Sequence, residues 1–131
     1  MDQPWMFDRF RSGQTLGRHR EALDATSLAE WFALCPADRD LLPWMPPGLA
    51  IAVVMRAYMR VLPHRPPGNV HAGQDLDIVR LPGVDAMLTT ILTCADKRVS
   101  NDRRRVIFAT ETTGDDGYVF FRSRISMIWA G

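Results

Sequence analysis

The sequence predicts an α+β domain in which a curved antiparallel sheet wraps around one long central helix. The first half of the chain has helical patterns, and the second half has the alternation of apolar and polar residues that is typical of strands. Leu49–Leu62 is the long helical segment, and its apolar residues lie on nearly all faces, as expected for a buried helix. Extended segments separated by turns follow this helix. A buried helix and an antiparallel sheet can cover each other's apolar faces in such an arrangement.

Length and composition indicate one ordinary globular domain. The chain has 131 residues, of which 47% are hydrophobic and 24% are charged, so we expect residues 1–131 to form a single domain with a real core. The net charge of +1 gives no reason to expect a nucleic acid or an anionic membrane as a partner. The longest apolar stretch, Leu49–Met55, is too short to span a bilayer.

Cysteine usage and the N-terminal residues predict a cytoplasmic protein. Cys35 and Cys94 are isolated in different segments, which is typical of free thiols. The first ten residues carry two aspartates and lack an apolar core of signal-peptide length.

The first half of the chain is expected to hold two helices. Ser27 is the expected N-cap of a short helix, with Glu30 completing a capping box, and this helix should end near Pro36. The proline-rich apolar stretch Leu41–Gly48 is predicted to be rigid and non-helical, and it leads into Leu49–Leu62.

The second half of the chain is expected to form the sheet. The predicted strands are Val70–Ile78, Ala86–Ala95, Val106–Thr113 and Tyr118–Trp129, with a weaker strand pattern at Gly17–Ala25. Within the first of these strands, His71, Asp75 and Asp77 are expected to share the face opposite the apolar residues. A long exposed edge strand is a liability unless it is paired, so we expect a dimer in which two sheets join edge to edge.

Several segments resemble one superfamily in their order and spacing. Pro43–Leu49 resembles the proline-rich entry to the central helix of acyl-carrier-protein dehydratases, and His71–Ile78 with Leu81–Asp85 is similar to the strand and Pro-Gly-Asp turn after that helix. Phe10–Leu16 with the short helix after it looks like the start of MaoC-like hydratases, and Val119–Ala130 resembles the closing strand. The sequence is therefore similar to the hot-dog superfamily, in its MaoC-like hydratase and 3-hydroxyacyl-thioester dehydratase branch.

This resemblance implies a site and a mechanism. In the family, a thioester carbonyl docks against a backbone amide at the N-terminus of the central helix, and a carboxylate and a histidine act as general acid and base. For this chain it implies an acyl-CoA or acyl-carrier-protein thioester as substrate, bound near a dimer interface at Gly48 and Leu49. Trp44 and Met45 are either core or dimer-contact residues or walls of the acyl pocket.

No further small-molecule group is expected. The resemblance implies no cofactor, and the three histidines and scattered acids have no metal-ligand spacing, so no metal is assigned. The basic run Arg103–Arg105 is expected on a loop, either as a solvated surface or beside a phosphate such as the nucleotide end of coenzyme A.

The chain departs from the family at its catalytic positions. MaoC-like hydratases carry Gly-Asp-x-Asn-Pro-aliphatic-His where this chain has Ala37–Pro43. Asp38 matches the aspartate, but Pro43 stands in the histidine position and has no proton to exchange. The carrier-protein dehydratases use a histidine and a glutamate at positions that correspond here to Leu41 or Leu42 and to Val53. The family's catalytic pairs are therefore incomplete.

Three functions remain open from the sequence. The chain could be a hydratase or dehydratase with an altered dyad of Asp38 and His71, although Asp38 could instead end a helix and His71 could lie on the surface. It could be a non-catalytic, thioester-binding subunit that pairs with a second hot-dog chain. It could also be a thioesterase-type hot dog, but Leu49–Leu62 lacks the acid that such enzymes need near the central helix.

Overall fold

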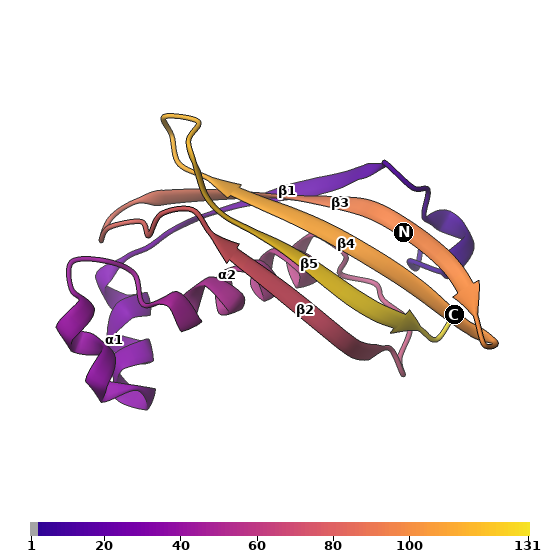
Figure 1. Cartoon of the computed structure of the whole chain (residues 1–131), viewed down its shortest axis with the longest axis horizontal. Coiled ribbons are helices and arrows are strands. Elements are labelled where there is room, and N and C mark those ends of the chain that lie inside the picture. The colour runs from indigo at the N-terminus through magenta and orange to yellow at the C-terminus, as the bar shows by residue number, and fades with distance from the viewer. Residues whose placement is uncertain (1–2) are drawn as a thin grey trace.

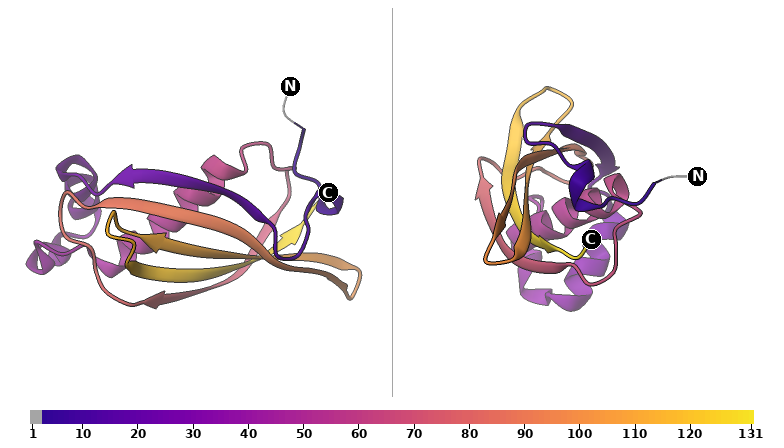
Figure 2. Two further views of the ribbon diagram at one scale, coloured as in Figure 1. Left: turned by 90° about the horizontal axis from the view of Figure 1, so that it is seen from above. Right: turned by 90° about the vertical axis from the view of Figure 1, so that its right-hand side faces the viewer.

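A computed structural model describes residues 3–131. Its sheet has five antiparallel strands in the order β1-β3-β4-β5-β2. The strands are Thr15–Ala22 (β1), Val70–Ile78 (β2), Met87–Ser100 (β3), Arg103–Thr113 (β4) and Val119–Trp129 (β5). The helices are Phe7–Arg9 (η1), Ala25–Leu34 (α1), Pro36–Leu41 (η2) and Pro47–Val61 (α2). The curved sheet covers α2 along one face, and α1 lies beyond one end of the sheet (Figures 1 and 2), which confirms the predicted α+β arrangement.

The core lies between α2 and the inner face of the sheet. Buried residues from α2 include Val53, Val54 and Ala57, and those from the strands include Leu92, Phe108 and Ile125. The helix is not buried on every side as predicted, because Ile51 and Met59 are each 45% exposed. The sheet covers only one side of α2, so the opposite side is left open.

Helix α1 begins earlier than predicted, and its N-cap is Asp24 instead of Ser27. The Asp24 carboxylate accepts a hydrogen bond from the Ser27 backbone N–H at 2.8 Å. Ser27 is therefore the third helical residue, and the predicted capping box with Glu30 is wrong. An N-cap side chain accepts a hydrogen bond from the backbone N–H of the third helical residue, so Asp24 caps the helix three residues before the predicted position.

The β3–β4 hairpin is longer than predicted, and Arg103–Arg105 begin β4 instead of lying on a loop. The turn is made by Asn101 and Asp102, whose φ angles are 54° and 62°. Both residue types tolerate the left-handed region, so two residues suffice to reverse the chain. This hairpin lies at the end of the sheet opposite α1 (Figure 1), which is also the end opposite the start of α2.

A β-bulge in β2 turns His71 away from the face predicted for it. Asp75 and Asp77 lie opposite Arg124 and Arg122 of β5, on the outer face of the sheet. The register shifts between His71 and Gly73, so His71 lies opposite Met127. Directly opposed residues share a face, and Met127 belongs to the core. The prediction that His71 shares a face with the two aspartates is therefore wrong.

The two edges of the sheet are β1 and β2. Each pairs with one neighbour only, β1 with β3 and β2 with β5. None of the helices formed by residues 3–131 is long and apolar enough to cross a membrane.

Candidate functional site

The candidate site lies at the start of α2, where α1, η2 and the turn after β2 meet. The segment that enters α2 is tied to this turn by backbone hydrogen bonds: the Val84 N–H donates to the Pro43 carbonyl at 2.9 Å, and the Met45 N–H donates to the Pro82 carbonyl at 2.8 Å. The first turn of α2 is therefore fixed relative to the sheet.

The first peptide N–H of α2 belongs to Gly48 and is unpaired. Pro46 is the N-cap and Pro47 the first helical residue, and neither carries an N–H. The Leu49 N–H donates to the Pro46 carbonyl at 3.0 Å. Gly48 is exposed, and its N–H has no acceptor among residues 3–131. The positive end of the α2 dipole therefore offers a free donor to a bound oxygen atom.

Trp31 of α1 packs against Gly48, and Asp38 of η2 binds the indole of Trp31. The indole Nε1–H of Trp31 donates a hydrogen bond to the Asp38 carboxylate at 2.8 Å. The same ring packs on Gly48, because a Cβ atom placed there would lie only 2.8 Å from Trp31 Cζ2. Trp31 and Asp38 are both half-buried. The close approach of the ring explains why this position needs a glycine.

Trp31 is the site residue that sequence reasoning missed. Its partner Asp38 lies beyond the end of α1, seven residues along the chain, and its other contact, Gly48, belongs to the next helix. A tryptophan in a short helix next to a buried phenylalanine, Phe32, is expected to be core. No local pattern in the sequence indicates that its N–H reaches a carboxylate.

The other residues predicted to bind substrate fall into different environments. Leu49 and Met45 are buried, at 4% and 0% exposure, so both side chains belong to the core. Trp44 is 55% exposed, and its ring covers Gly83 of the turn after β2. Of this group, Gly48 offers its backbone and Trp44 its ring to a molecule bound outside the core.

The structure does not bring Asp38 and His71 together within one chain. Asp38 lies beside the start of α2, whereas His71 lies at the start of β2, close to the end of α2 (Figure 1). Helix α2 has 15 residues and is therefore about 22 Å long. A proton-transfer pair needs hydrogen-bond reach or one bridging water, so these two residues cannot form a dyad inside one protomer.

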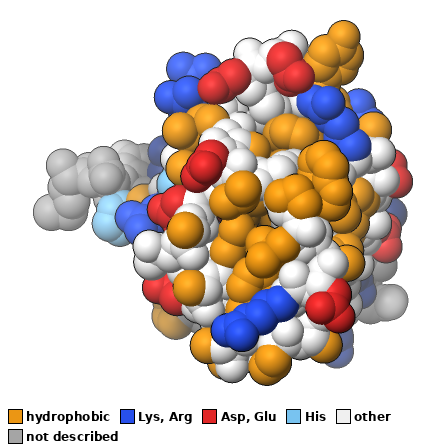
Figure 3. All heavy atoms as spheres, turned by 90° about the vertical axis from the view of Figure 1, so that its left-hand side faces the viewer, with side chains coloured by type: hydrophobic (Ala, Val, Ile, Leu, Met, Phe, Trp, Pro, Cys, Tyr) orange, Lys and Arg blue, Asp and Glu red, His pale blue; other side chains and the backbone are white. Residues whose placement is uncertain are grey.

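Exposed apolar side chains surround the candidate site. At the end of the molecule that carries α1, hydrophobic side chains form a broad exposed area (Figure 3). The large exposed hydrophobic residues of the segments at this end include Leu34, Leu41, Leu42, Trp44 and Val84. We call these five residues the apolar end. A contiguous apolar area of this kind is typical of a surface that another molecule covers.

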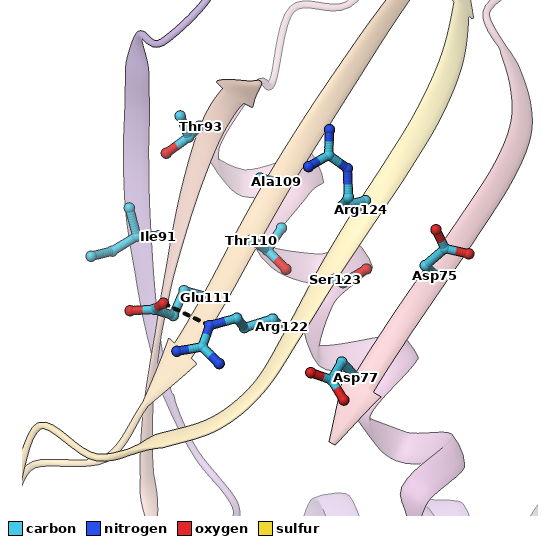
Figure 4. A pocket seen from close by; sticks show the side chains of 10 residues that line it. All are labelled: Asp75, Asp77, Ile91, Thr93, Ala109, Thr110, Glu111, Arg122, Ser123 and Arg124. Carbon is cyan, nitrogen blue, oxygen red and sulfur yellow. Dashed lines mark hydrogen bonds and ion pairs between the residues drawn. The ribbon is translucent and has the colours of Figure 1, made fainter. Parts of the chain in front are cut away.

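A second concave region lies on the outer face of the sheet, away from α2. It is a hollow of about 520 Å³ across β2, β3, β4 and β5. Figure 4 shows its charged side chains, with Glu111 and Arg122 paired at 3.1 Å and Asp75, Asp77 and Arg124 around them. None of the predicted site residues lines it. The hollow contains no histidine or cysteine, and its charged groups are solvent-accessible, so we place the candidate site at α2 instead.

The described residues also offer no preformed metal centre. Among residues 3–131, no group of three or more histidine, cysteine, aspartate or glutamate side chains is arranged to hold a metal ion.

No protein-family model matches the chain, and no curated protein matches it. Solved structures do match. The MaoC-like dehydratase from Rhodospirillum rubrum has a TM-score of 0.78 at 16% identity, over 95% of this chain and 96% of that chain. The R-hydratase PhaJ1 from Pseudomonas aeruginosa has a TM-score of 0.77 at 19% identity, over 95% of this chain and 84% of that chain.

A two-component dehydratase has the same fold. The C-terminally truncated HadBC (3R-hydroxyacyl-ACP dehydratase) complex from Mycobacterium tuberculosis matches with a TM-score of 0.72 at 13% identity, over 89% of this chain and 96% of that chain. At such identities the likeness establishes the fold. Residues 3–131 form a hot-dog fold, as the sequence resemblance implied.

Proposed function

We propose that this hot-dog domain binds an acyl thioester at the start of α2 and works as a hydratase- or dehydratase-type subunit that relies on a second hot-dog chain for its catalytic base. The observation that carries the proposal is the unpaired N–H of the exposed residue Gly48 at the positive end of α2. Acyl-CoA and acyl-carrier-protein thioesters share the group that this amide would recognise.

The Gly48 amide has the chemistry that a thioester carbonyl requires. Hydration or dehydration next to a thioester builds negative charge on the carbonyl oxygen, and a fixed N–H at a helix N-terminus stabilises such charge. The absence of a side chain at Gly48 lets the Trp31 ring pack beside this amide. Pro46 and Pro47 stiffen the backbone before it, so the donor is held in place before the substrate arrives.

The need for a partner follows from the groups around this amide. Pro43 stands where MaoC-like hydratases carry their histidine, and its carbonyl is used to hold Val84. Asp38 is linked to Gly48 through the Trp31 ring, and its carboxylate accepts the Trp31 indole N–H. A proton acceptor for the acyl chain therefore has to come from outside this cluster.

Two surfaces support the presence of a partner. The outer edge of β2 is unpaired, and an open strand edge is a template for another strand. The apolar end surrounds the start of α2 and is exposed. A second hot-dog chain could cover both, and HadBC shows that this fold occurs in a complex.

Binding and turnover of the purified chain test the proposal. We expect calorimetry to show binding of a saturated acyl-CoA, with much weaker binding of free coenzyme A, and we expect no hydration of enoyl-CoA thioesters. Gly48→Pro removes the N–H, whereas Gly48→Ala keeps it and adds the same Cβ. Proline should weaken acyl-CoA binding more than alanine does. Absence of acyl-CoA binding by the parent chain would contradict the proposal.

A self-sufficient homodimeric hydratase is the second candidate, favoured by the bulge in β2. The bulge turns His71 towards the helix side of the sheet. If two copies paired antiparallel through β2, the start of one strand would lie beside the end of the other. The end of β2 lies towards the start of α2 (Figure 1), so His71 of a second copy would approach the Asp38 end of the first.

Mixing variants separates this candidate from the first. The parent chain should then hydrate enoyl-CoA alone, and Asp38→Asn and His71→Ala should each abolish turnover. A mixture of the two inactive variants should regain activity, because each mixed dimer contains one site with both residues intact. Without turnover by the parent chain, this candidate is excluded.

A thioesterase is not favoured by the structure. Thioesterases of this fold generally need an acid on or near the central helix. Helix α2 (Pro47–Val61) contains none, and the carboxylate of Asp38 near its start is engaged by the Trp31 indole N–H. Release of free thiol from a saturated acyl-CoA by the purified chain would overturn this conclusion.

A further inference from the structure

We infer that Trp31, held in place by Asp38, is a specificity-determining residue that limits the bulk of the acyl group beside the thioester carbonyl. The inference rests on the proposed binding of a thioester at Gly48. It assigns to Asp38 a positioning role through Trp31, in place of the acid–base role that the family resemblance implies.

Trp31 lies on the side of Gly48 from which a substrate would approach. The Cα–Cβ bonds of a helix tilt towards its N-terminus, and the free N–H groups of the first turn point the same way. Trp31 Cζ2 and Cη2 lie 2.8 and 3.0 Å from the position that a Gly48 Cβ would take. The ring therefore flanks the space in front of the Gly48 N–H, where a hydrogen-bonded carbonyl oxygen would sit.

The ring is held by one side-chain hydrogen bond and by the ordered backbone between Trp31 and Asp38. Its Nε1–H donates to Asp38 Oδ2 at 2.8 Å, and the backbone between the two residues is held by the Cys35 N–H donating to the Trp31 carbonyl and the Asp38 N–H donating to the Cys35 carbonyl. An indole has a single donor, and a bond from it to a carboxylate is stronger than one to a neutral oxygen. Turning the ring away from Gly48 would break this bond.

A fixed aromatic ring next to the thioester carbonyl discriminates between acyl groups by their shape. A straight acyl chain places only hydrogen atoms on the carbon next to the carbonyl, whereas an α-methyl branch places a methyl group there. One misplaced methyl group in a rigid apolar site changes affinity by about tenfold or more. We therefore expect the parent chain to bind straight acyl thioesters at least about tenfold more tightly than α-methyl-branched isomers.

The test compares two isomeric ligands, pentanoyl-CoA and α-methylbutanoyl-CoA, on the full chain by calorimetry. The variants are Trp31→Ala, which removes the ring, Asp38→Ala, which removes its anchor, and Asp38→Asn, which keeps an oxygen acceptor for the indole and removes the charge. The readout is the ratio of the two dissociation constants within each variant. This ratio does not depend on how much of a variant is folded.

Trp31→Ala and Asp38→Ala should bring the ratio close to one, and Asp38→Asn should stay within about threefold of the parent, since a neutral acceptor can still hold the ring. The Trp31 indole N–H resonance, identified among the four tryptophans by its loss in Trp31→Ala, should shift when pentanoyl-CoA is added.

An unchanged ratio in Trp31→Ala, or an Asp38→Asn variant that behaves like Asp38→Ala, would overturn the inference while leaving thioester binding intact. Absence of pentanoyl-CoA binding by the parent chain would overturn both the inference and the proposed function.

Discussion

Tyr58 of α2 buries a hydroxyl group that has no hydrogen-bond partner among the described residues. The side chain is 3% exposed and packs edge-on against Phe108 of β4. A buried hydroxyl without a partner loses its hydration and gains nothing in return. Burial also raises the pKa of Tyr58 from 10.0 to about 12, because the phenolate would be charged in an apolar environment.

We expect Tyr58→Phe to raise the free energy of unfolding by about 1 kcal/mol, because it removes the unpaired group and keeps the ring. The folded pKa lies above the unfolded one, so between pH 10 and about 12 the unfolded chain loses the proton that the folded chain keeps. Stability should fall across this window in the parent and fall less in Tyr58→Phe. Urea titrations at several pH values measure both effects. Tyr118→Phe, on a side chain that is 66% exposed, is the control and should change neither.

Asp24 shows how a single carboxylate sets the start of α1. Its acceptance of the Ser27 N–H lowers the pKa of Asp24 below its ordinary value of 3.8. The ionised cap also interacts favourably with the positive end of the helix dipole.

We expect Asp24→Ala to lower the midpoint of thermal unfolding, and Asp24→Asn to lower it less, because asparagine also caps helices well. Since the folded pKa is depressed, the contribution of the Asp24 charge is present above pH 3.8 and is lost as the pH falls through the lower folded value. The difference between parent and Asp24→Asn should therefore vanish in acid, as followed by circular dichroism. A difference that persists below that range would show that charge is not the cause.

At the scale of elements, a charged cluster ties the edge strand β1 to α2. Arg56 of α2 contacts the Glu21 carboxylate through Nη2 at 2.6 Å and through Nε at 3.2 Å, and His19 lies 3.1 Å from the same carboxylate. The Glu21 side chain is 18% exposed. The hydrogen bond to Glu21 raises the pKa of Arg56, so this guanidinium stays charged.

We expect Glu21→Gln to lower the free energy of unfolding by about 0.5–1 kcal/mol, since a two-point contact in good geometry lies at the upper end for partly exposed ion pairs. Urea unfolding at low and high salt measures the loss, which should shrink in salt. The exposed pair of Arg20 and Asp115, with side chains 59% and 70% exposed, provides the comparison. Asp115→Asn should have no measurable effect, and an equal loss from both substitutions would contradict the geometric argument.

Sequence reasoning located well those elements in which burial determines the order of apolar and polar residues. The last strand, β5, alternates between core residues such as Ile125 and exposed ones such as Arg124, so its period is visible in the sequence. The central helix α2 is apolar enough to be recognised, and its ends shift by only one or two residues.

The elements that sequence reasoning misplaced are decided by contacts between strands. The β3–β4 hairpin extends past the core, where Val99 and Arg104 pair as exposed residues and no burial pattern marks the strand. The bulge at His71 is a one-residue change of register against β5, which no property of β2 alone encodes.

At the scale of the whole molecule, the sequence identified the location of the candidate site but not its construction. The prolines before Gly48 and the proline at position 43 are visible in the sequence itself. The family resemblance indicated that the former lead into the central helix and that the latter stands in the position of the catalytic histidine. The contact of Trp31 with Asp38 and Gly48 depends on how α1, η2 and α2 meet, which the sequence does not state. The separation of Asp38 from His71 also follows only from the course of the chain around α2.

The charges on the two open edges indicate which partner the molecule suits. The edge strand β1 contains Arg18, Arg20 and Glu21, and charged residues of this kind discourage strand addition. The other edge strand, β2, carries its acids, Asp75 and Asp77, in its second half, and its first half contains the small residues Ala72 and Gly73, so that half is less protected. Association through the sheet should therefore use β2.

A homodimer could join antiparallel through β2 in a register that pairs Asp75 of one copy with Asp77 of the other, and the acids of the two copies would then face each other. In the register that brings His71 of one copy to the end of β2 of the other, Asp77 would instead lie near His71. The Asp75 and Asp77 side chains lie on the outer face and have no hydrogen-bond or ion-pair partner among residues 3–131. Like charges across neighbouring strands destabilise the pairing, although Arg124 and Arg122 of β5 lie opposite Asp75 and Asp77 and offset part of this repulsion. A different hot-dog chain with basic residues at these positions would fit this edge better than a second copy does.

We therefore expect self-association to be weak at about 0.05 M salt and stronger at about 0.5 M, where the repulsion is screened. The double substitution of Asp75→Asn and Asp77→Asn should give the stronger association already at low salt. Sedimentation velocity measures the mass under each condition, and hydrogen exchange should show protection appearing in β2 and not in β1. The matched control replaces Asp8 and Asp102, exposed acids outside β2 that have no ion-pair partner among residues 3–131, with asparagine, and it should leave the salt dependence unchanged. A tight dimer at low salt that salt weakens would show that β2 already pairs favourably with itself, and it would favour the self-sufficient homodimer over a chain that needs a different partner.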